Sequence, residues 1–477
     1  MAAVTFGLVS CPVMGQELPK KQLTPDDYKL WETLNLNAIS HNGNWLSYTK
    51  THSSGTGMLY IKNIKTGLEM AFPNGADGRF AAERSFAFLN NDTLKIVNLT
   101  NGSRREIRHV LQYSYSQNNS WLVTSEQVNG EQQLCIYDKD GHLTQRVPHL
   151  VTYQWNVQKN AFLYHTADVG KSAVGLMFLS KKIVNESVMQ SGSPVSELTW
   201  NKSATAVAFY STPNPKGTAD MVHYFNLADK RLYSLKSVQD QFTVKAADDL
   251  RLTVSDDGQA VYFQTSSPIQ INPADTSKVE IWRNDDKALA RTRKLKVAMR
   301  NEAALAVWYP HTGQSTPISD ATYRWVTVAG RDHALVADPL VHEPQFRWFA
   351  GIDVILVNLK SDARRKILEN QNAQFGNLKV SKSGRYLTYY REANWWIYDV
   401  DHDKHINVTH GLNGEWVEGY RPHATDGNWV FGIAGWTSDQ KYALFYDRYD
   451  IWAISPAGMM TPLSPLATTS AMPPISV

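Results

Sequence analysis

The sequence predicts an all-β fold, a β-propeller of about eight (seven to nine) four-stranded blades preceded by a short N-terminal helix. One short pattern recurs along the 477 residues. It begins with an apolar or aromatic residue, passes through a polar turn and ends in alternating apolar residues, as short antiparallel strands do. The copies lie about 40 to 55 residues apart, which leaves room for four strands each. Aromatic residues, which favour half-buried pleated sheets, are abundant, with Trp 15, Tyr 22 and Phe 16.

The clearest copy of the pattern occupies residues 432–455. It opens on Trp436, turns through residues 437–441 and continues as strands over 442–446 and 450–455. Further copies begin near Ile39, Tyr115, Trp155, Trp200, Val254 and Val380, and weaker copies begin near Phe88 and Val328. One blade cannot bury both faces of its sheet, whereas a ring stacks each blade on its neighbours. We therefore expect the propeller to span residues 36–458.

Between these copies lie second hairpins, for example at residues 58–67 and 395–400. Residues 279–318 read as an elongated blade whose charged insert, 283–300, is an exposed loop. The last stretch, 459–477, contains no charged residue and is rich in Pro, Ser, Thr and Ala. Such a composition favours a flexible tail over a strand, so we expect 459–477 to be a disordered tail or the remnant of a lost reading frame.

The N-terminus predicts export. Residues 2–15 form an uncharged, mostly apolar run, and Val13 and Gly15 suit the −3 and −1 positions of a signal-peptidase site. We expect residues 1–15 to be a signal peptide and the protein to be periplasmic or extracellular, although a basic n-region is missing. A rival interpretation makes Cys11 the lipid-bearing cysteine of a lipoprotein. Cys135, the other of the two cysteines, lies in a strand-like stretch and is expected to be a buried small hydrophobe.

Residues 16–35 are predicted to form an N-terminal helical segment, with the helix itself over 23–34. Thr24 can cap it, Pro25 suits its first position, and Asp26 and Asp27 complement the positive end of the helix. Tyr28, Trp31 and Leu34 share one face at a spacing of three residues, so this helix needs an apolar partner.

The charge balance excludes one class of partner. With 48 basic and 45 acidic residues the net charge is +3, and no basic stripe suggests nucleic-acid binding. No segment after the leader is apolar and long enough to be a transmembrane helix. The oligomeric state is left open.

Three stretches resemble motifs that bind phosphate or metal, and each has a simpler structural interpretation. Gly170-Lys171-Ser172 ends like a phosphate-binding loop, but His165 stands where the first glycine is needed, so a plain hairpin is preferred. Asp399, Asp401 and Asp403 begin like a calcium loop, but Lys404 and His410 occupy the turn-glycine and glutamate positions. A solvated hairpin is preferred there too. The nearby His402, His405, His410 and His423 form no helical pair and are interpreted as surface residues.

Two further motifs could bear on catalysis or ligand contact. Ser193 lacks the strand, elbow and helix that surround a hydrolase nucleophile, so a turn is preferred. Asp447, Arg448 and Asp450 could line the channel or form an ion-pair cluster between blades, and the structural role is preferred. No catalytic, cofactor-binding or metal-ligating residue is therefore assigned.

Three stretches resemble the sequences of a known family. They are Ser-His-Asn-Gly-Asn-Trp-Leu-Ser-Tyr (40–48), Ser-Lys-Ser-Gly-Arg-Tyr-Leu-Thr-Tyr (381–389) and Gly-Ile-Ala-Gly-Trp together with Tyr-Asp-Arg-Tyr-Asp-Ile-Trp (432–452). Over residues 23–458 the chain resembles the N-terminal propeller of bacterial prolyl oligopeptidase-like serine peptidases, of the acylaminoacyl- and dipeptidyl-peptidase type. The resemblance implies a propeller that covers an active site and admits only short peptides. It also implies an α/β-hydrolase domain as the partner of the N-terminal helix.

The chain departs from that family in one respect. In the family an α/β-hydrolase domain with a Ser-Asp-His triad follows the propeller, and its nucleophile sits in a G-x-S-x-G elbow. No G-x-S-x-G occurs in these 477 residues, so the triad cannot be placed on any of them. We expect a truncated peptidase that is inactive alone.

Two other classes of function stay open. One is a free-standing periplasmic propeller that binds or scaffolds a partner through its rim or channel. The other is a propeller enzyme that uses rim carboxylates, such as a glycosidase or lyase, for which the sequence offers no recognisable carboxylate pair.

Overall fold

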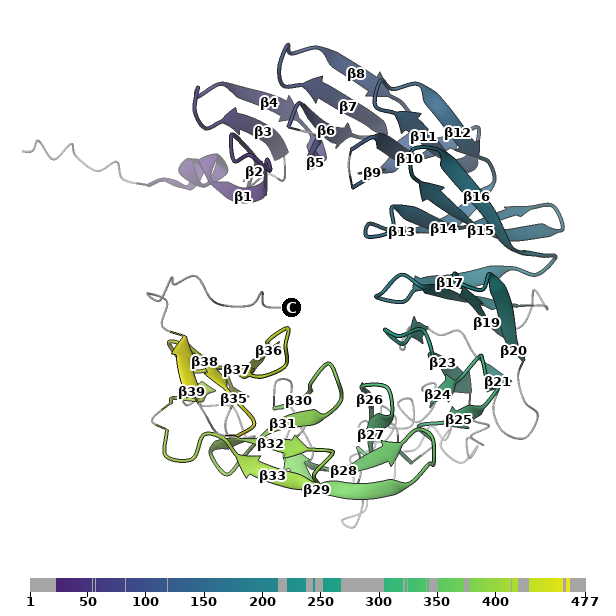
Figure 1. The fold of residues 1–477 in the computed structure, drawn as a ribbon. Helices are drawn as coiled ribbons and strands as arrows, with labels where there is room; N and C mark the ends of the chain where they lie inside the picture. Colours follow the sequence, from purple (N-terminus) through teal and green to yellow (C-terminus); the bar gives the residue numbers. More distant parts are fainter. Residues whose placement is uncertain are drawn as a thin grey trace, which may run out of the picture. The chain divides into compact units, whose positions relative to one another are not determined.

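The chain was analysed as a computed structural model, shown in Figure 1. The structure describes residues 23–53, 55, 57–81, 83–117, 119–212, 221–236, 243–244, 252–266, 304–320, 322–323, 325–339, 341–342, 351–372, 377–412, 414–418, 429–457 and 460–463. The predicted signal peptide, Cys11, the charged insert 283–300 and His423 lie outside these residues. The chain divides into two compact units, Met1–His149 and Leu150–Val477, and each is described by itself.

The first unit contains three four-stranded antiparallel sheets. The first sheet is formed by β1 (Glu32–Ile39), β2 (Trp45–His52), β3 (Gly57–Asn63) and β4 (Glu69–Pro73). The second is formed by β5 (Gly75–Ala81), β6 (Ser85–Asn90), β7 (Thr93–Asn98) and β8 (Arg104–Ile107). The third is formed by β9 (Val110–Tyr115), β10 (Trp121–Val128), β11 (Glu131–Asp138) and β12 (Leu143–Val147).

The second unit begins with two sheets of the same kind. They are β13 (Leu150–Asn156), β14 (Ala161–Asp168), β15 (Lys171–Leu179) and β16 (Ile183–Ser191), then β17 (Val195–Trp200), β18 (Ala206–Ser211), β19 (Met221–Asn226) and β20 (Arg231–Lys236). A five-stranded sheet follows, with β21 (Thr243–Val244), β22 (Thr253–Val254), β23 (Val261–Ser266), β24 (Ala304–Trp308) and β25 (Ser315–Pro317).

Three more four-stranded sheets and one strand pair complete the second unit. They are β26 (Trp325–Ala329), β27 (His333–Ala337), β28 (Gly351–Asn358) and β29 (Arg364–Asn372); β30 (Leu378–Val380), β31 (Tyr386–Arg391), β32 (Asn394–Asp399) and β33 (Lys404–Asn407); the pair β34 (Val417–Glu418) and β35 (Trp429–Val430); and β36 (Ile433–Trp436), β37 (Ala443–Tyr446), β38 (Ile451–Ile454) and β39 (Met460–Leu463).

The all-β prediction is confirmed. In each four-stranded sheet the strands follow one another in chain order, so every sheet is an up-and-down meander of the kind that forms a propeller blade. The described residues form eight four-stranded sheets, one five-stranded sheet and one two-stranded pair. The predicted ring of about eight blades stays a prediction.

The recurring pattern marks the same place in almost every sheet, the turn between its first and second strands. Seven copies begin at or beside the end of a first strand, in β1, β9, β13, β17, β22, β30 and β36, and the weaker copy near Val328 marks the end of β26. The weaker copy near Phe88 falls within a four-stranded sheet but one strand later than the other copies. Phe88 lies in β6, the second strand of its sheet, and the turn that precedes β6 spans residues 82–84.

Six of these turns, which begin at Ser40, Ser116, Asn201, Ser255, Ser381 and Thr437, share one hydrogen-bonding arrangement. The first turn residue donates its N–H across the base of the hairpin, and the residue three positions later donates its N–H back to the first carbonyl. The N–H of Ser255 meets the carbonyl of Ala260 at 2.8 Å, and that of Gly258 meets the carbonyl of Ser255 at 2.9 Å. The turns that begin at Ser40, Ser381 and Thr437 repeat both bonds. A side chain often closes the turn as well, since the Ser255 hydroxyl donates to Asp257 at 2.6 Å.

The predicted helix over 23–34 is largely wrong. Only Pro25–Leu30 is helical, as a 3-10 helix, and β1 already begins at Glu32. The capping prediction is sound, because the N–H and hydroxyl of Thr24 both donate to the Asp27 carboxylate, at 2.8 and 2.9 Å. The helix stops at Trp31, whose ψ of 132° is extended, because the backbone from Glu32 onward pairs with β2. Backbone pairing in the sheet thus outweighs the helical spacing of the side chains.

The predicted tail begins too early. Met460–Leu463 is β39, which pairs antiparallel with β38 and completes the last sheet. The prediction rested on the Pro, Ser, Thr and Ala content of 459–477, but proline is tolerated on an edge strand, and Pro462 lies on one.

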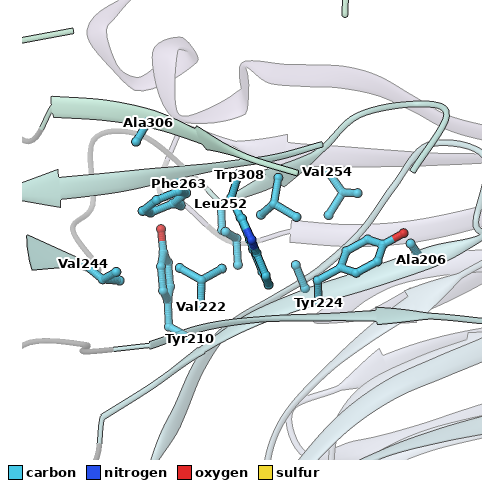
Figure 2. Packing of buried hydrophobic residues seen from close by; sticks show 12 residues of the cluster. Ala206, Tyr210, Val222, Tyr224, Val244, Leu252, Val254, Phe263, Ala306 and Trp308 are labelled. Carbon is cyan, nitrogen blue, oxygen red and sulfur yellow. The ribbon is translucent and has the colours of Figure 1, made fainter. Parts of the chain in front are cut away.

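Apolar clusters fill the space between successive sheets of each unit. In Figure 2, Tyr210, Val222 and Tyr224 of the β17–β20 sheet face Phe263, Ala306 and Trp308 of the five-stranded sheet. One buried hydroxyl in this core has a partner, since the Tyr210 hydroxyl accepts the backbone N–H of Gln264 at 3.0 Å. The successive sheets are therefore held together by packed side chains as well as by the turns.

Candidate functional site

One hollow in the described part of the second unit lies among the turns that join first and second strands. Its volume is about 480 Å³, and its charged lining residues are Lys202, Asp256, Asp257, Arg331 and Lys382. They come from four consecutive sheets. The hollow, called the turn cleft below, is defined by these five residues together with Tyr262.

Turn length explains why a cleft forms at this place. The turn between β26 and β27 contains only residues 330–332, whereas those of the neighbouring sheets contain 255–260 and 381–385. The short turn is recessed between two longer ones. Across it, the Lys382 ammonium lies 3.5 Å from the Asp256 carboxylate, which links two sheets that are not neighbours in the chain.

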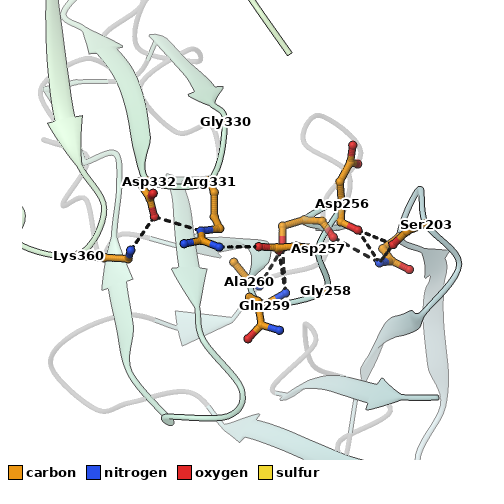
Figure 3. Close-up of polar contacts among 12 residues, drawn as sticks. Ser203, Asp256, Asp257, Gly258, Gln259, Ala260, Gly330, Arg331, Asp332 and Lys360 are labelled. Carbon is orange, nitrogen blue, oxygen red and sulfur yellow. Dashed lines mark hydrogen bonds and ion pairs between the residues drawn. The ribbon is translucent and has the colours of Figure 1, made fainter. Parts of the chain in front are cut away.

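One wall of the cleft is a row of alternating charges, shown in Figure 3. The Arg331 guanidinium lies 3.1 Å from Asp257 and 3.3 Å from Asp332, and Lys360 lies 2.8 Å from Asp332. Arg331 is therefore held from both sides. These side chains are about half exposed, so each pair contributes at most about 1 kcal/mol to stability.

The neighbouring charges in this wall also fix the charge states of its two carboxylates. Partial burial acts to raise the pKa of Asp257, but hydrogen bonds from Ser255 and Gln259 and the neighbouring Arg331 lower the pKa below its usual range. The hydrogen bond from Lys360 lowers the pKa of Asp332. Both carboxylates are consequently ionised at neutral pH, and the wall carries fixed charges.

One phenol, that of Tyr262, lines the cleft, and the phenol of Tyr309 lies beside it. The Tyr262 hydroxyl lies 3.5 Å from the Gly330 carbonyl, and burial raises its pKa. The Tyr309 hydroxyl, close enough to Asp332 and Arg331 to feel their charges, is buried and has no hydrogen-bond partner. Both phenols stay neutral, so they can offer hydrogen bonds but no negative charge.

Two glycines allow the turns beside the cleft to meet back to back. A Cβ added at Gly330 would lie 2.0 Å from the carbonyl oxygen of Ser383, and one added at Gly384 would lie 2.2 Å from the backbone of Ala329. Both glycines also have positive φ, of 65° and 78°. Only glycine fits either position.

The side chains that line the cleft can bind a ligand. Among the described residues that line the cleft there is no histidine, and the Ser255 hydroxyl donates to the Asp257 carboxylate. Among the described residues, no three His, Cys, Asp or Glu side chains gather in a way that could hold a metal ion. The cleft presents cations, carboxylates and a phenol, which suits a ligand that carries both charge and hydrogen-bonding groups.

The motifs weighed in the sequence lie in hairpins and connections of the described sheets. Gly170 lies in the hairpin between β14 and β15, and Ser193 lies in the connection between β16 and β17, as expected. Asp399 and Asp403 flank the hairpin between β32 and β33. Asp399 pairs with Arg385 at 3.2 Å, and Asp403 pairs with Arg365 at 2.5 Å.

The predicted ion-pair cluster at 447–450 differs in its partners. Arg448 pairs with Glu415, at 3.2 Å, and not with the two aspartates beside it. Asp447 instead accepts the indole N–H of Trp452 at 2.7 Å, and its second oxygen accepts the backbone N–H groups of Tyr449 and Asp450. The motif therefore shapes a hairpin, which is the structural role that was preferred.

The turn cleft itself was not predicted. Its residues fall in turns that look alike in the sequence, and its formation depends on one turn being shorter than its neighbours. The short Ala329-Gly330-Arg331-Asp332-His333 connection was the available signal.

Comparison with known proteins gives structural matches only. No protein-family model matches the chain, and no curated protein matches it. Among solved structures, prolyl endopeptidases match with a TM-score of 0.32 and 13% identity, over 80% of this chain and 50% of that chain. The β-propeller domain of the Trilobed protease from Pyrococcus furiosus matches with a TM-score of 0.28 and 10% identity, over 71% of this chain and 99% of that one.

An oligogalacturonate lyase from Vibrio parahaemolyticus also matches, with a TM-score of 0.29 and 12% identity, over 66% of this chain and 89% of that chain. The chain spans half the length of the prolyl endopeptidase chain that it matches. Since every TM-score is below 0.5, these matches carry no argument about activity.

Among the described residues, no helix is long and apolar enough to cross a membrane.

Proposed function

We propose that this chain is the propeller portion of an exported serine peptidase of the prolyl oligopeptidase type, and that it limits access of peptides to a hydrolase domain. The supporting observation is the recurrence of one turn, with the same pair of hydrogen bonds, between the first and second strands of several of the described sheets. The stretches that form these turns, 40–48 and 381–389, are the ones that resemble the family's propeller.

The turn cleft is the part of the described structure best suited to contact a passing peptide. A peptide carries charged ends and backbone amides, and the cleft offers both signs of charge beside a neutral phenol. The 477 residues contain no G-x-S-x-G elbow, so no catalysis is proposed for them.

The experiment offers the purified chain chromogenic dipeptides together with a serine-reactive phosphonate. We expect neither turnover nor covalent labelling, with an intact prolyl oligopeptidase as the positive control. Turnover accompanied by labelling would contradict the proposal that this chain is not catalytic by itself.

Peptide contact is tested separately by fluorescence anisotropy with labelled short peptides. Lys382→Glu reverses a charge in the cleft and should weaken binding about tenfold. Lys404→Glu, an exposed change in β33 away from the cleft, is the matched control and should bind as the parent does. Equal binding by both variants would show that the cleft is not the contact surface.

Export is the remaining part of the proposal and rests on residues 1–15 alone. N-terminal sequencing of the secreted protein should begin at Gln16. A lipid-modified Cys11 at the first position would instead support the lipoprotein interpretation.

A further inference from the structure

We propose that the contact between the β13–β16 sheet and the β17–β20 sheet, called the histidine seam below, is an acid-sensitive latch that loosens when its two buried histidines are protonated. The inference is independent of the proposed function. It rests on the position of these imidazoles within a packed apolar interface.

The apolar part of the seam is contributed by both sheets. Leu163 and Val174 of one sheet pack with Phe209 and Phe225 of the other, and all four are at most 4% exposed. Side chains two positions apart on a strand point to the same face. The residues two positions further along each strand therefore face the same interface, and these residues are polar.

Two histidines take up the next positions in these rows. His165 follows Leu163 on β14, and His223 precedes Phe225 on β19. They are 2% and 4% exposed, respectively. The His223 ring also stacks on Phe209, with centroids 4.9 Å apart. Both imidazoles are thus part of the packed interface rather than its solvent edge.

Their polar partners are hydroxyl groups. His165 Nε2 lies 2.9 Å from the Ser172 hydroxyl, and His223 lies 2.8 Å from the hydroxyls of both Ser211 and Ser234. His165 Nδ1 is buried and has no hydrogen-bond partner. A hydroxyl can accept or donate, but it supplies no negative charge to an imidazolium.

No carboxylate among the described residues compensates a charge on either ring. On the facing rows, β13 contributes Thr152, β16 contributes Met189 and Ser191, and β17 contributes Val195, all uncharged. The remaining charged side chains on these rows are Lys236 and Glu186. Lys236 is a cation on β20, and Glu186 is paired with Lys230 at 2.7 Å.

Protonation therefore opposes packing in this seam. Burial lowers the pKa of His165, and it lowers the pKa of His223 to about 4. An unfolded or opened histidine has a pKa of about 6.5. The open state thus binds more protons below pH 6.5, so the closed seam is fully stable above that pH and loses stability as the pH falls toward 4.

The test is hydrogen–deuterium exchange of the full chain at pH 7.5 and pH 5.0, corrected for intrinsic exchange rates. Protonation of His223 alone should raise the equilibrium constant for opening of β18 and β19 about 30-fold between pH 7.5 and pH 5.0. In the His223→Asn chain the rise should be smaller by about the same factor. His410→Asn, which changes an exposed histidine, is the matched control and should keep the full rise.

Equal acid-induced opening of β18 and β19 in the parent and in His223→Asn would overturn the proposal. A parent chain that shows no rise in these strands would overturn it as well. If the His223→Asn chain does not fold, the parent chain alone tests the proposal. At pH 5.0 the opening of β14, β15, β18 and β19 must then rise. The opening of β6 and β7, whose sheet contains no histidine, must not rise. An equal rise in all of these strands would refute the latch.

Discussion

At the scale of single residues, the turns decide how closely neighbouring sheets approach. Gly330 and Gly384 face each other's backbones at distances that leave no room for a side chain. Each also has a left-handed backbone, so the position is demanding for two separate reasons. The effect of the backbone conformation can be separated from the effect of the close contact by comparison with a glycine that has the positive φ but no close contact.

Gly384→Ala should destabilise the second unit by about 3 kcal/mol or more, because strain in φ adds to a contact with Ala329 at 2.2 Å. Gly411→Ala is the matched control, since Gly411 has a similar φ of 77° but nothing within 4 Å of an added Cβ. It should lose only about 1 kcal/mol. Urea unfolding of the two variants measures both values, and equal losses would mean that the close approach of the turns is not formed.

The prediction that Cys135 is a buried small hydrophobe is confirmed. It is completely buried in β11, and burial, assisted by the nearby Glu126 carboxylate, raises the pKa of its thiol to about 12. The reactive form of a cysteine is the thiolate. Its hydrophobic neighbours in a strand made this burial predictable.

In a Cys11→Ser chain, iodoacetamide should therefore leave Cys135 unlabelled at pH 8 under native conditions. Because its pKa is raised, labelling should stay slow up to at least pH 10. The same chain in urea should react fully, which serves as the control. Rapid labelling of the native protein would contradict the packing described for β11.

At the scale of elements, the sequence predicts strands well and chain ends poorly. The turns after Ile39, Trp200, Val254 and Val380 are where the pattern places them, because a polar turn between apolar strands has a local physical cause. The 3-10 helix and β39 were missed because pairing with β2 and β38 decides them, and such pairing is not local. The turn cleft was missed for a related reason, since it depends on the relative lengths of three turns.

β39 gives an element-scale prediction. A chain that ends at residue 457 loses β39 and exposes the edge of β38, so its melting temperature should fall by about 4 °C or more. A chain that ends at Leu463 keeps β39 and is the matched control, expected to melt as the parent does. Differential scanning calorimetry compares the three chains. Identical melting of both truncated chains would show that β39 adds nothing to the last sheet.

At the scale of the whole molecule, each unit is a series of similar sheets, so its stability accumulates from contacts between neighbours rather than from one central core. The turn cleft and the histidine seam are two places where that series is irregular. In the cleft one turn is shortened, and in the seam imidazoles replace apolar side chains. Irregularities of this kind are where a repetitive fold can acquire a function.

The central proposal is that these sheets belong to the propeller of a prolyl oligopeptidase-like peptidase. The most direct measurement is to sequence the DNA beyond the codon for Val477. The account predicts a G-x-S-x-G coding region within the next few hundred codons, in any frame. Several hundred codons without such a region would contradict the peptidase assignment and favour a free-standing binding propeller.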